Sequence, residues 1–433
     1  MQPPDSHRVF LLAFIAALLL SAGVLVLQWP SSVTPRDAPA DVFSGERAVD
    51  ALTRLLDAAG GGPHPVGSDA NARLHRALVA ELEALGWEVE LQRGVGCRNL
   101  RTCAAVENVI ARRPGRGTGP AVMVGCHTDS VAAGPGASDD GAGMATMVEL
   151  ARNLAAAPDL DRPVWLLFNE GEEMGLLGAD LFTRTMEPGS VGAVVNLEAR
   201  GTEGPVWFFE ISDGGGALVD AYARSVPRPT TSSVAYSVYR RMPNDTDLTV
   251  FRGAGLPGLG LAYIDGGARY HTLRDDLDHL STASVERMGQ ATLGLVRNLA
   301  SRELPPAAKE TVFFDVAALF TMHWPAALSL PLALVAALLL AVGARRRVGP
   351  LELLGGAGAW LLAAVAAGLG GALVYFGLRA VGALPMAFPA NLATATAAAA
   401  LTGTSAALLS ARAFSLNPTA RLYGVLAGLT VLG

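Results

Sequence analysis

The stretch from Val122 to Glu173 reads VMVGCHTDSVAAGPGASDDGAGMATMVELARNLAAAPDLDRPVWLLFNEGEE and contains three clusters of side chains that can bind a metal ion. An apolar run ends in the letters HTD, a glycine-rich loop ends in SDDG, and a second apolar run ends in EGEE. Open α/β sheets build their sites at the carboxyl ends of parallel strands. The pattern therefore predicts that the three clusters meet at one edge of a sheet.

Strands and helices alternate around this stretch. Short apolar or alternating runs predict strands at residues 87–92, 107–111, 121–126, 163–168, 191–197, 206–211 and 256–263. Helical spacing predicts helices from residue 44 to about 56, and at 70–85, 141–157, 176–186 and 283–304. The alternation favours the α/β class, with a mostly parallel, mixed sheet sandwiched by helices.

The composition indicates a membrane protein. Of 433 residues, 51% are hydrophobic and only 17% are charged, which is too apolar for a purely soluble chain. The formal net charge of −6 is spread without basic blocks. A nucleic-acid partner is therefore not expected.

The N-terminus predicts a transmembrane anchor at residues 1–29. Val9 to Leu27 is uncharged and apolar, close to the length that crosses a bilayer, and Trp29 follows where an interfacial anchor would lie. A cleaved signal peptide is the competing interpretation, and both place the following residues outside the cytoplasm. Residues 30–43 are expected to be a linker, and residues 44–304 a folded domain.

Beyond Ser301 the composition shifts towards membrane segments. We expect a linker at residues 305–324 and a multi-span region at 325–433. Its apolar runs cover residues 325–344, 353–378, 392–409 and 422–433. The last run is too short to cross a bilayer, so either the sequence is truncated there or this run is re-entrant.

The basic residues predict the orientation. Arg345 to Arg347 follow one span directly and indicate the cytoplasmic side, which leaves the domain at 44–304 on the extracytoplasmic side. The spans contain almost no charged residues, so a transport pathway is not favoured. Their glycines and alanines permit close helix packing, and we interpret them as an anchor or a platform for homo-oligomers.

The cysteines leave one question open. Cys97 and Cys103 are spaced for a disulfide in an exported protein, but two free thiols fit the sequence equally well. Cys126 lies inside an apolar run and is expected to be buried.

Five separated elements together resemble the zinc-dependent peptidase family M28, aminopeptidase type. With the N-terminal span and the membrane-rich C-terminus, the arrangement is most similar to the family's membrane-bound endoplasmic reticulum branch and its bacterial relatives. The resemblance covers residues 50–301 and implies a zinc exopeptidase fold; beyond them it rests on architecture alone. The elements are HTDS at 127–130, SDDGAG at 138–143, NEGEEMGLLGA at 169–179, NLEARG at 196–201 and the pair Tyr270-His271.

The resemblance implies two zinc ions per chain and a ligand role for five residues. Asp139 would bridge the metals, His127 and Glu198 would complete one site, and Glu173 and His271 the other. A pair of zinc ions requires a bridging carboxylate and further nitrogen and oxygen ligands on each metal, and the chain has these groups.

Three more residues would serve the reaction on a peptide substrate. The resemblance leaves Glu172 as the general base, which takes a proton from the attacking water and delivers it to the leaving amine. Asp129, two residues beyond His127, would fix the tautomer of that imidazole. Tyr270 resembles the family's donor to the developing oxyanion.

Glu198 departs from many soluble aminopeptidases of the family, which carry aspartate there. The longer side chain still ligates, but the metal spacing and the exopeptidase polarity become open.

Other acidic and histidine residues have structural interpretations. Asp140 is expected to be a helix cap or loop residue, and Asp245 and Asp247 either lie near the substrate cleft or cap a loop. At most one of the acidic residues after His271 is expected to orient that side chain; these are Asp275, Asp276 and Asp278. The histidines interpreted as structural or exposed are His7, His64, His75, His279 and His323.

The sequence thus predicts an extracytoplasmic, membrane-anchored dizinc exopeptidase, with aminopeptidase activity on peptides favoured. A metal-free binding or scaffold ectodomain is one alternative, and a glutaminyl cyclase, which shares the fold, is another. Carboxypeptidase or dipeptidase polarity also stays open, as do the physiological substrate and the oligomeric state.

Overall fold

The computed structural model describes residues 26–98, 101–242, 244–302 and 309–344, together with the single positions 15, 19, 23 and 24. The chain divides into two units. Residues 27–323 form one unit, and residues 1–26 with 324–433 form the other.

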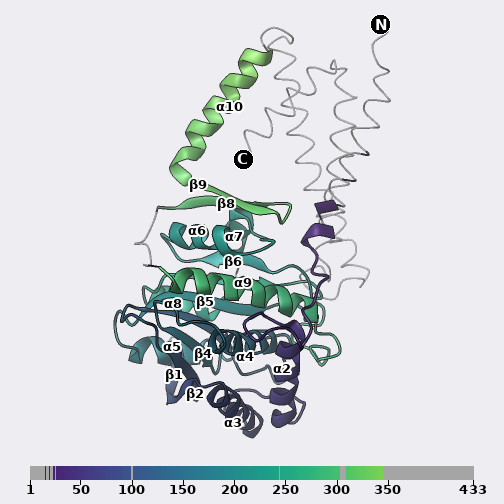
Figure 1. The fold of residues 1–433 in the computed structure, drawn as a ribbon, viewed down its shortest axis with the longest axis vertical. Coiled ribbons are helices and arrows are strands. Elements are labelled where there is room, and N and C mark those ends of the chain that lie inside the picture. Colours follow the sequence, from purple (N-terminus) through teal and green to yellow (C-terminus); the bar gives the residue numbers. More distant parts are fainter. Residues whose placement is uncertain are drawn as a thin grey trace. The chain divides into compact units, whose positions relative to one another are not determined.

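A seven-stranded mixed sheet forms the centre of the unit at 27–323 (Figure 1). Its strands are β1 (Glu88–Arg98), β2 (Thr102–Arg113), β3 (Ala121–His127), β4 (Val164–Asn169), β5 (Val191–Ala199), β6 (Trp207–Ile211) and β7 (Gly258–Tyr263). Their order is β1-β2-β4-β3-β5-β7-β6. The central strands β4, β3, β5 and β7 are parallel, whereas β1, β2 and β6 pair antiparallel. The expected mixed, mostly parallel core is confirmed.

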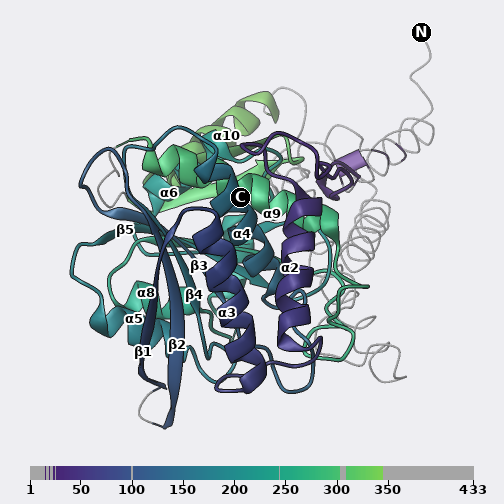
Figure 2. The same cartoon turned by 60° about the horizontal axis from the view of Figure 1, so that its bottom comes forward.

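Helices cover both faces of this sheet, as predicted. One face carries α2 (Gly45–Ala59), α3 (Asp69–Ala84), α4 (Gly141–Ala155) and α9 (Thr282–Ala300), several of which run side by side in Figure 2. The other face carries α5 (Leu177–Thr185) and α8 (Asp247–Gly253). Two further helices, α6 (Gly216–Ser225) and α7 (Ser233–Tyr239), pack against α9 and β6 respectively.

Alternation along the strands divides the core into two layers. On β3, Val122 and Val124 join the core under α4 and α9, whereas Met123 joins the core under α5 and α8. On β5, Val195 lies in the first core and Val194 in the second. Because successive side chains point to opposite faces, the parity of a residue number on these strands decides which layer a functional side chain enters.

Side-chain caps define where several helices begin. Ser44, Ser68 and Ser281 each precede a helix and accept a hydrogen bond from a backbone N–H in its first turn. Such caps satisfy donors that the helix itself leaves unpaired. Asp140 does the same at α4, so the interpretation of this residue as a cap is confirmed.

Residues 30–43 are tied to the helices by two buried carboxylates. Glu286 on α9 accepts hydrogen bonds from the backbone and hydroxyl of Thr34 and from the backbone of Gly45. Glu149 on α4 accepts from the backbone of Ser44 and from the Arg47 guanidinium. The predicted linker is therefore held to α9 at Thr34, and the residues directly after it are held to α4 and α9.

Three regions contain structure that the periodicity did not predict. Strands β1 and β2 are longer than expected and form a hairpin closed by a Cys97–Cys103 disulfide, which settles the state of these thiols. Helices α6, α7 and α8 lie between β6 and β7. A second hairpin, β8 (Thr311–Val316) and β9 (Phe320–Pro325), occupies much of the segment expected to be a linker.

In the other unit, η1 (Ala326–Leu328) is followed by α10 (Ser329–Ala344). Among the helices in the described part of the chain, none combines the length and apolar character that crossing a bilayer requires. Most of the first predicted span, at 9–27, and all of those at 353–378, 392–409 and 422–433 lie outside the described residues.

A close contact in the main core provides a test of this packing. A Cβ atom added to Gly289 on α9 would lie 1.9 Å from the ring of Phe43, which is only 1% exposed. We expect Gly289→Ala to destabilise the protein by about 1–3 kcal/mol, the usual result of overpacking. The matched control is Gly253→Ala on α8, where nothing lies within 4 Å. Both changes gain helix propensity, so equal melting temperatures for the two variants would contradict the packing described here.

Candidate metal centre

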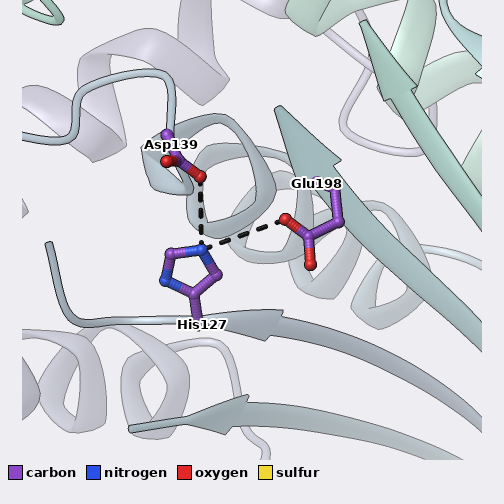
Figure 3. Close-up of side chains that lie close together, drawn as sticks. All are labelled: His127, Asp139 and Glu198. Atoms are coloured by element: carbon purple, nitrogen blue, oxygen red, sulfur yellow. Dashed lines mark ion pairs between the residues drawn. The ribbon is translucent and has the colours of Figure 1, made fainter. Parts of the chain in front are cut away.

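The strand pattern brings His127 and Glu198 together on one face of the sheet. Gly125 of β3 pairs with Asn196 of β5, so two residues further along the parallel register places His127 beside Glu198. His127 lies four residues after Met123 on β3, and Glu198 lies four residues after Val194 on β5. Both side chains therefore point to the face of the sheet that α5 and α8 cover. Figure 3 shows Nε2 of His127 facing two carboxylates, 3.3 Å from Asp139 Oδ1 and 4.0 Å from Glu198 Oε2.

Asp139 lies on the loop between β3 and α4, and a second aspartate holds that loop in place. Oδ1 of Asp275 accepts a hydrogen bond from the backbone N–H of Ser138 at 2.8 Å, and Oδ2 accepts from that of Asp139 at 3.1 Å. Asp275 is 2% exposed. The sequence predicts that at most one of the acidic residues after His271 orients that histidine, whereas Asp275 positions Asp139.

Asp129 positions the acidic loop after β4. Its Oδ1 accepts hydrogen bonds from the backbone N–H groups of Gly171 and Glu172, and its Oδ2 accepts from that of Glu173. The tautomer of His127 is set differently from the prediction, because Nδ1 of the ring lies 2.9 Å from the backbone carbonyl oxygen of Asp129. The Asp129 carboxylate is 3.7 Å from that nitrogen, too far for a hydrogen bond.

His271 enters the centre from the loop between β7 and α9. Its Nε2 lies 3.1 Å from Asp139 Oδ2 and 3.0 Å from Glu173 Oε1. The backbone of His271 has φ of 57°, a left-handed conformation that non-glycine residues adopt rarely and that is concentrated at functional sites. The ring of Tyr270 stacks on the His271 ring at 3.7 Å.

The resulting donors fit metal ions. Within the described residues, one group with converging ligand atoms is His127, Asp139 and Glu198, and another is Asp139, Glu173 and His271. Three atoms of the second group are buried and have no hydrogen-bond partner among the described residues: Asp139 Oδ2, Glu173 Oε1 and His271 Nε2. Imidazole nitrogen and carboxylate oxygen are zinc ligands, and both groups use Asp139, as a bridging carboxylate would.

Glu172 belongs to a third such group, with His127 and Glu173. Burial and the nearby charge of Glu198 raise the pKa of Glu172 well above its usual range. Burial likewise raises the pKa of Glu198. Burial opposes the charge of His127, but Asp139 and Glu172 outweigh it and raise the pKa of this imidazole. The buried carboxylates therefore create a strongly negative site that favours cations.

Asp139 and His271 illustrate the same electrostatics. Although burial opposes its charge, the adjacent His127 and His271 side chains hold the pKa of Asp139 well below its usual value. Burial would lower the pKa of His271, but Asp139 and Glu173 raise it to about 9. An ionised Asp139 can serve as a ligand to two cations at once.

Two buried asparagines and Asp247 lie behind the proposed metal ligands, and the sequence leaves the role of Asp247 open. Asn196 donates from Nδ2 to Glu198 Oε1 at 3.3 Å, and Asn169 donates from Nδ2 to Asp247 Oδ2 at 2.6 Å. Asp247 opens α8 and is 1% exposed, and burial raises its pKa to about 6. In the sequence, the one signal for a functional role of Asp247 is its position after the polar residues 244–246, and loop capping explains that position equally well.

The remaining predicted residues lie as follows. Tyr270 lies 5.5 Å, at its ring centroid, from the guanidinium carbon of Arg200, and burial and Asp139 raise its pKa, so its hydroxyl stays protonated. His64 and His75 are buried outside the ligand groups, and His279 pairs with Asp276. His323 lies 3.9 Å from Asp220. His7 lies outside the described residues.

Comparisons with known proteins identify the family. Residues 108–296 match the model described as Peptidase family M28. Endoplasmic reticulum metallopeptidase 1 from Mus musculus is 31% identical over 345 residues, covering 73% of this chain and 37% of that protein. Vacuolar membrane protease from Coccidioides posadasii is 35% identical over 184 residues, covering 42% and 18% respectively. The chain thus spans well under half the length of these relatives.

One solved structure supports the fold. The aminopeptidase from Aneurinibacillus sp. strain AM-1 superimposes with a TM-score of 0.50 at 15% identity, covering 62% of this chain and 97% of that one. At this identity the match concerns the arrangement of helices and strands alone.

The buried Asp247 generates a pH-dependent prediction for chelator-treated protein. A carboxyl group whose pKa is 3.8 when unfolded and about 6 when folded costs stability at high pH, by roughly 3 kcal/mol. Asp247→Asn keeps an acceptor for Asn169 without the charge. Its melting temperature should exceed that of the parent above pH 6, and the difference should vanish towards pH 4. Asp57→Asn, at an exposed helix position, is the control, and a gain for Asp247→Asn that is independent of pH would contradict this account.

Proposed function

Because residues 108–296 form a domain of peptidase family M28, we propose that the chain is a zinc-dependent exopeptidase, and that it acts as an aminopeptidase on peptides. The observation that carries the proposal is the sharing of Asp139 between two groups of converging donors, with Glu172 beside them. One bridging carboxylate between two sets of nitrogen and oxygen ligands is the arrangement that a pair of zinc ions needs.

The proposed ligands divide between the two sides of Asp139. His127 and Glu198 would hold one ion, and Glu173 and His271 the other. Zinc bound there would supply a Lewis acid that polarises the scissile carbonyl and lowers the pKa of a water molecule.

Glu172 is the proposed general base. Its carboxylate accepts a proton from the attacking water and then donates that proton to the departing amine. A pKa raised by burial and by Glu198 suits both steps, because a base that must also return the proton works best when its pKa lies near the working pH.

Two further residues support this step. Asp129 binds three consecutive backbone N–H groups of the loop at 171–173, and so holds the Glu172 carboxyl relative to the ligands. Tyr270 keeps its proton and is adjacent to His271, so its hydroxyl can donate a hydrogen bond to an oxyanion that develops nearby.

Membrane attachment is part of the proposal. The names of the two relatives place them at the endoplasmic reticulum and at the vacuolar membrane. Together with the apolar segments at both ends of this sequence, they support a domain at 44–304 that is anchored to the lipid bilayer and faces away from the cytoplasm. Homo-oligomers through the C-terminal segments are compatible with this arrangement.

The alternatives differ in measurable ways. A binding or scaffold ectodomain would not require a complete ligand set, and all of the proposed ligands are present here. A glutaminyl cyclase would convert an N-terminal glutamine to pyroglutamate with release of ammonia, whereas hydrolysis releases free glutamine. Carboxypeptidase or dipeptidase polarity would appear as cleavage of N-blocked peptides or as restriction to dipeptides.

Replacing the proposed base separates chemistry from metal binding. We expect Glu172→Gln in the full chain to retain its zinc but to lose peptide hydrolysis by a factor of about 10²–10⁴, the usual contribution of a general base. The comparison is release of N-terminal residues from a peptide panel, measured beside zinc content. Glu83→Gln, at an exposed position on α3, should behave like the parent protein. Undiminished hydrolysis by Glu172→Gln would exclude Glu172 as the base.

Metal stoichiometry is a separate test. The purified chain should hold about two zinc ions, and chelation should abolish hydrolysis until zinc is restored. His271→Ala should reduce the stoichiometry to about one, because only one side of Asp139 loses a ligand. A stoichiometry near one in the parent protein would contradict the paired site and favour the cyclase alternative.

A further inference from the structure

A small polar cavity is lined by residues of β6, α7 and α8 and of the segment that joins the two helices. It has a volume of about 100 Å³, which is several times the space that a single water molecule needs. Glu210, Tyr239, Met242 and Asn244 are among its lining residues. None of these residues belongs to the proposed metal centre, and the cavity has room for a side chain of moderate size.

One lining residue of the cavity lies in the same row of the sheet as a residue that contacts a proposed metal ligand. Glu210 on β6 pairs with Gly260 on β7, and Gly260 pairs with Asn196 on β5. Paired residues lie in one row across the sheet, so the backbone of Glu210 is two strand spacings, roughly 10 Å, from the backbone of Asn196. Asn196 donates a hydrogen bond to the Glu198 carboxylate. Burial, together with the charges of Glu210 and Glu198, raises the pKa of Tyr239, so its hydroxyl stays protonated.

The charges around the cavity are balanced and already paired. Two acids and two bases line it, and each has an ionic partner. A ligand that carries a charge of either sign would therefore meet an equal number of like charges and find no free counter-ion. The pairs are Glu210 with Arg252, Asp245 with Arg98, and Arg240 with Asp213.

Two neutral groups of the lining, the Asn244 amide and the Tyr239 hydroxyl, have buried polar atoms without a hydrogen-bond partner among the described residues. Both amide atoms of Asn244, Nδ2 and Oδ1, are shielded from solvent and have no hydrogen-bond partner among the described residues. Shielded amide groups are normally hydrogen-bonded, so each unsatisfied one calls for an explanation, such as a ligand. A carboxamide can pair with another carboxamide by giving and receiving one hydrogen bond at once.

We propose that this cavity receives the side chain of the substrate residue next to the scissile bond, and that Asn244 selects glutamine or asparagine there. The inference rests on the proposed peptidase function and adds a substrate class to it. An apolar side chain of the same size would fill the cavity but leave both atoms of the Asn244 amide unpaired. Sites built to hydrogen-bond a substrate discriminate strongly against analogues that lack the matching group.

The test compares peptides that differ only at the N-terminal residue, with glutamine, leucine, lysine or glutamate at that position. In the full chain, kcat/KM for the glutamine peptide should exceed that for the leucine peptide by about tenfold or more. Asn244→Leu should reduce this ratio about tenfold while zinc content and leucine release are retained. Asn244→Asp, which is nearly isosteric, should also lose the glutamine preference and is the second variant if Asn244→Leu does not fold.

Met242→Leu is the matched control, because it changes another lining side chain without altering a hydrogen-bonding group. It should preserve the preference for glutamine. Hydrolysis led by the leucine peptide, or a glutamine-to-leucine ratio that Asn244→Leu and Asn244→Asp leave unchanged, would overturn the assignment of the cavity alone. No hydrolysis of any of the four peptides by zinc-loaded protein would overturn the proposed function, and this inference with it.

Discussion

Mutual repulsion among buried carboxylates is the constraint on which the rest of this structure depends. Asp139, Glu172, Glu173 and Glu198 converge at one edge of the sheet, where His127 and His271 offset part of their charge. Bringing ionised groups together away from water is costly unless each is paired with a cation or a hydrogen-bond donor. The pKa values in the cluster are displaced in the directions expected of such a site, and cations satisfy it better than the protein alone can.

The fold holds this cluster through carboxylates that are not in it. Asp129 binds the backbone of the loop with Glu172 and Glu173, and Asp275 binds the backbone before Asp139. Glu170 accepts hydrogen bonds from the backbones of Gly67 and Glu107, and so connects the same strand end to two other segments. In each case a buried anion is satisfied by N–H donors and in return fixes a loop. The ligands can therefore keep their positions despite their repulsion.

The two layers of the core also divide the functions. The α4 and α9 layer packs its apolar side chains against the strands, whereas the α5 and α8 layer becomes polar towards the carboxyl ends of the strands. The cavity at Asn244 lies on this polar side, in the segment between β6 and β7. The proposed metal ligands and the cavity proposed to select the substrate thus belong to different segments of the chain on one face of the sheet.

Periodicity and strand-end position in the sequence determined most of the architecture, and the resemblance to a known family supplied the proposed ligand set. Each sheet strand and five of the described helices (α2, α3, α4, α5 and α9) follow from apolar spacing. Parallel strands necessarily bring their carboxyl ends, with His127 and Glu198, to one edge. The short helices α7 and α8 escaped prediction because α7 buries no residue and α8 has only two buried apolar side chains, so neither produces a helical pattern. Only the tertiary structure decided the roles of Asp129, Asp275 and Asp247, the disulfide and the cavity. Cys97 and Cys103 are six residues apart, and their spacing fits both a disulfide and free thiols. The other groups have partners that are backbone amides or residues distant in sequence, and neither kind of partner leaves a local signal in the chain.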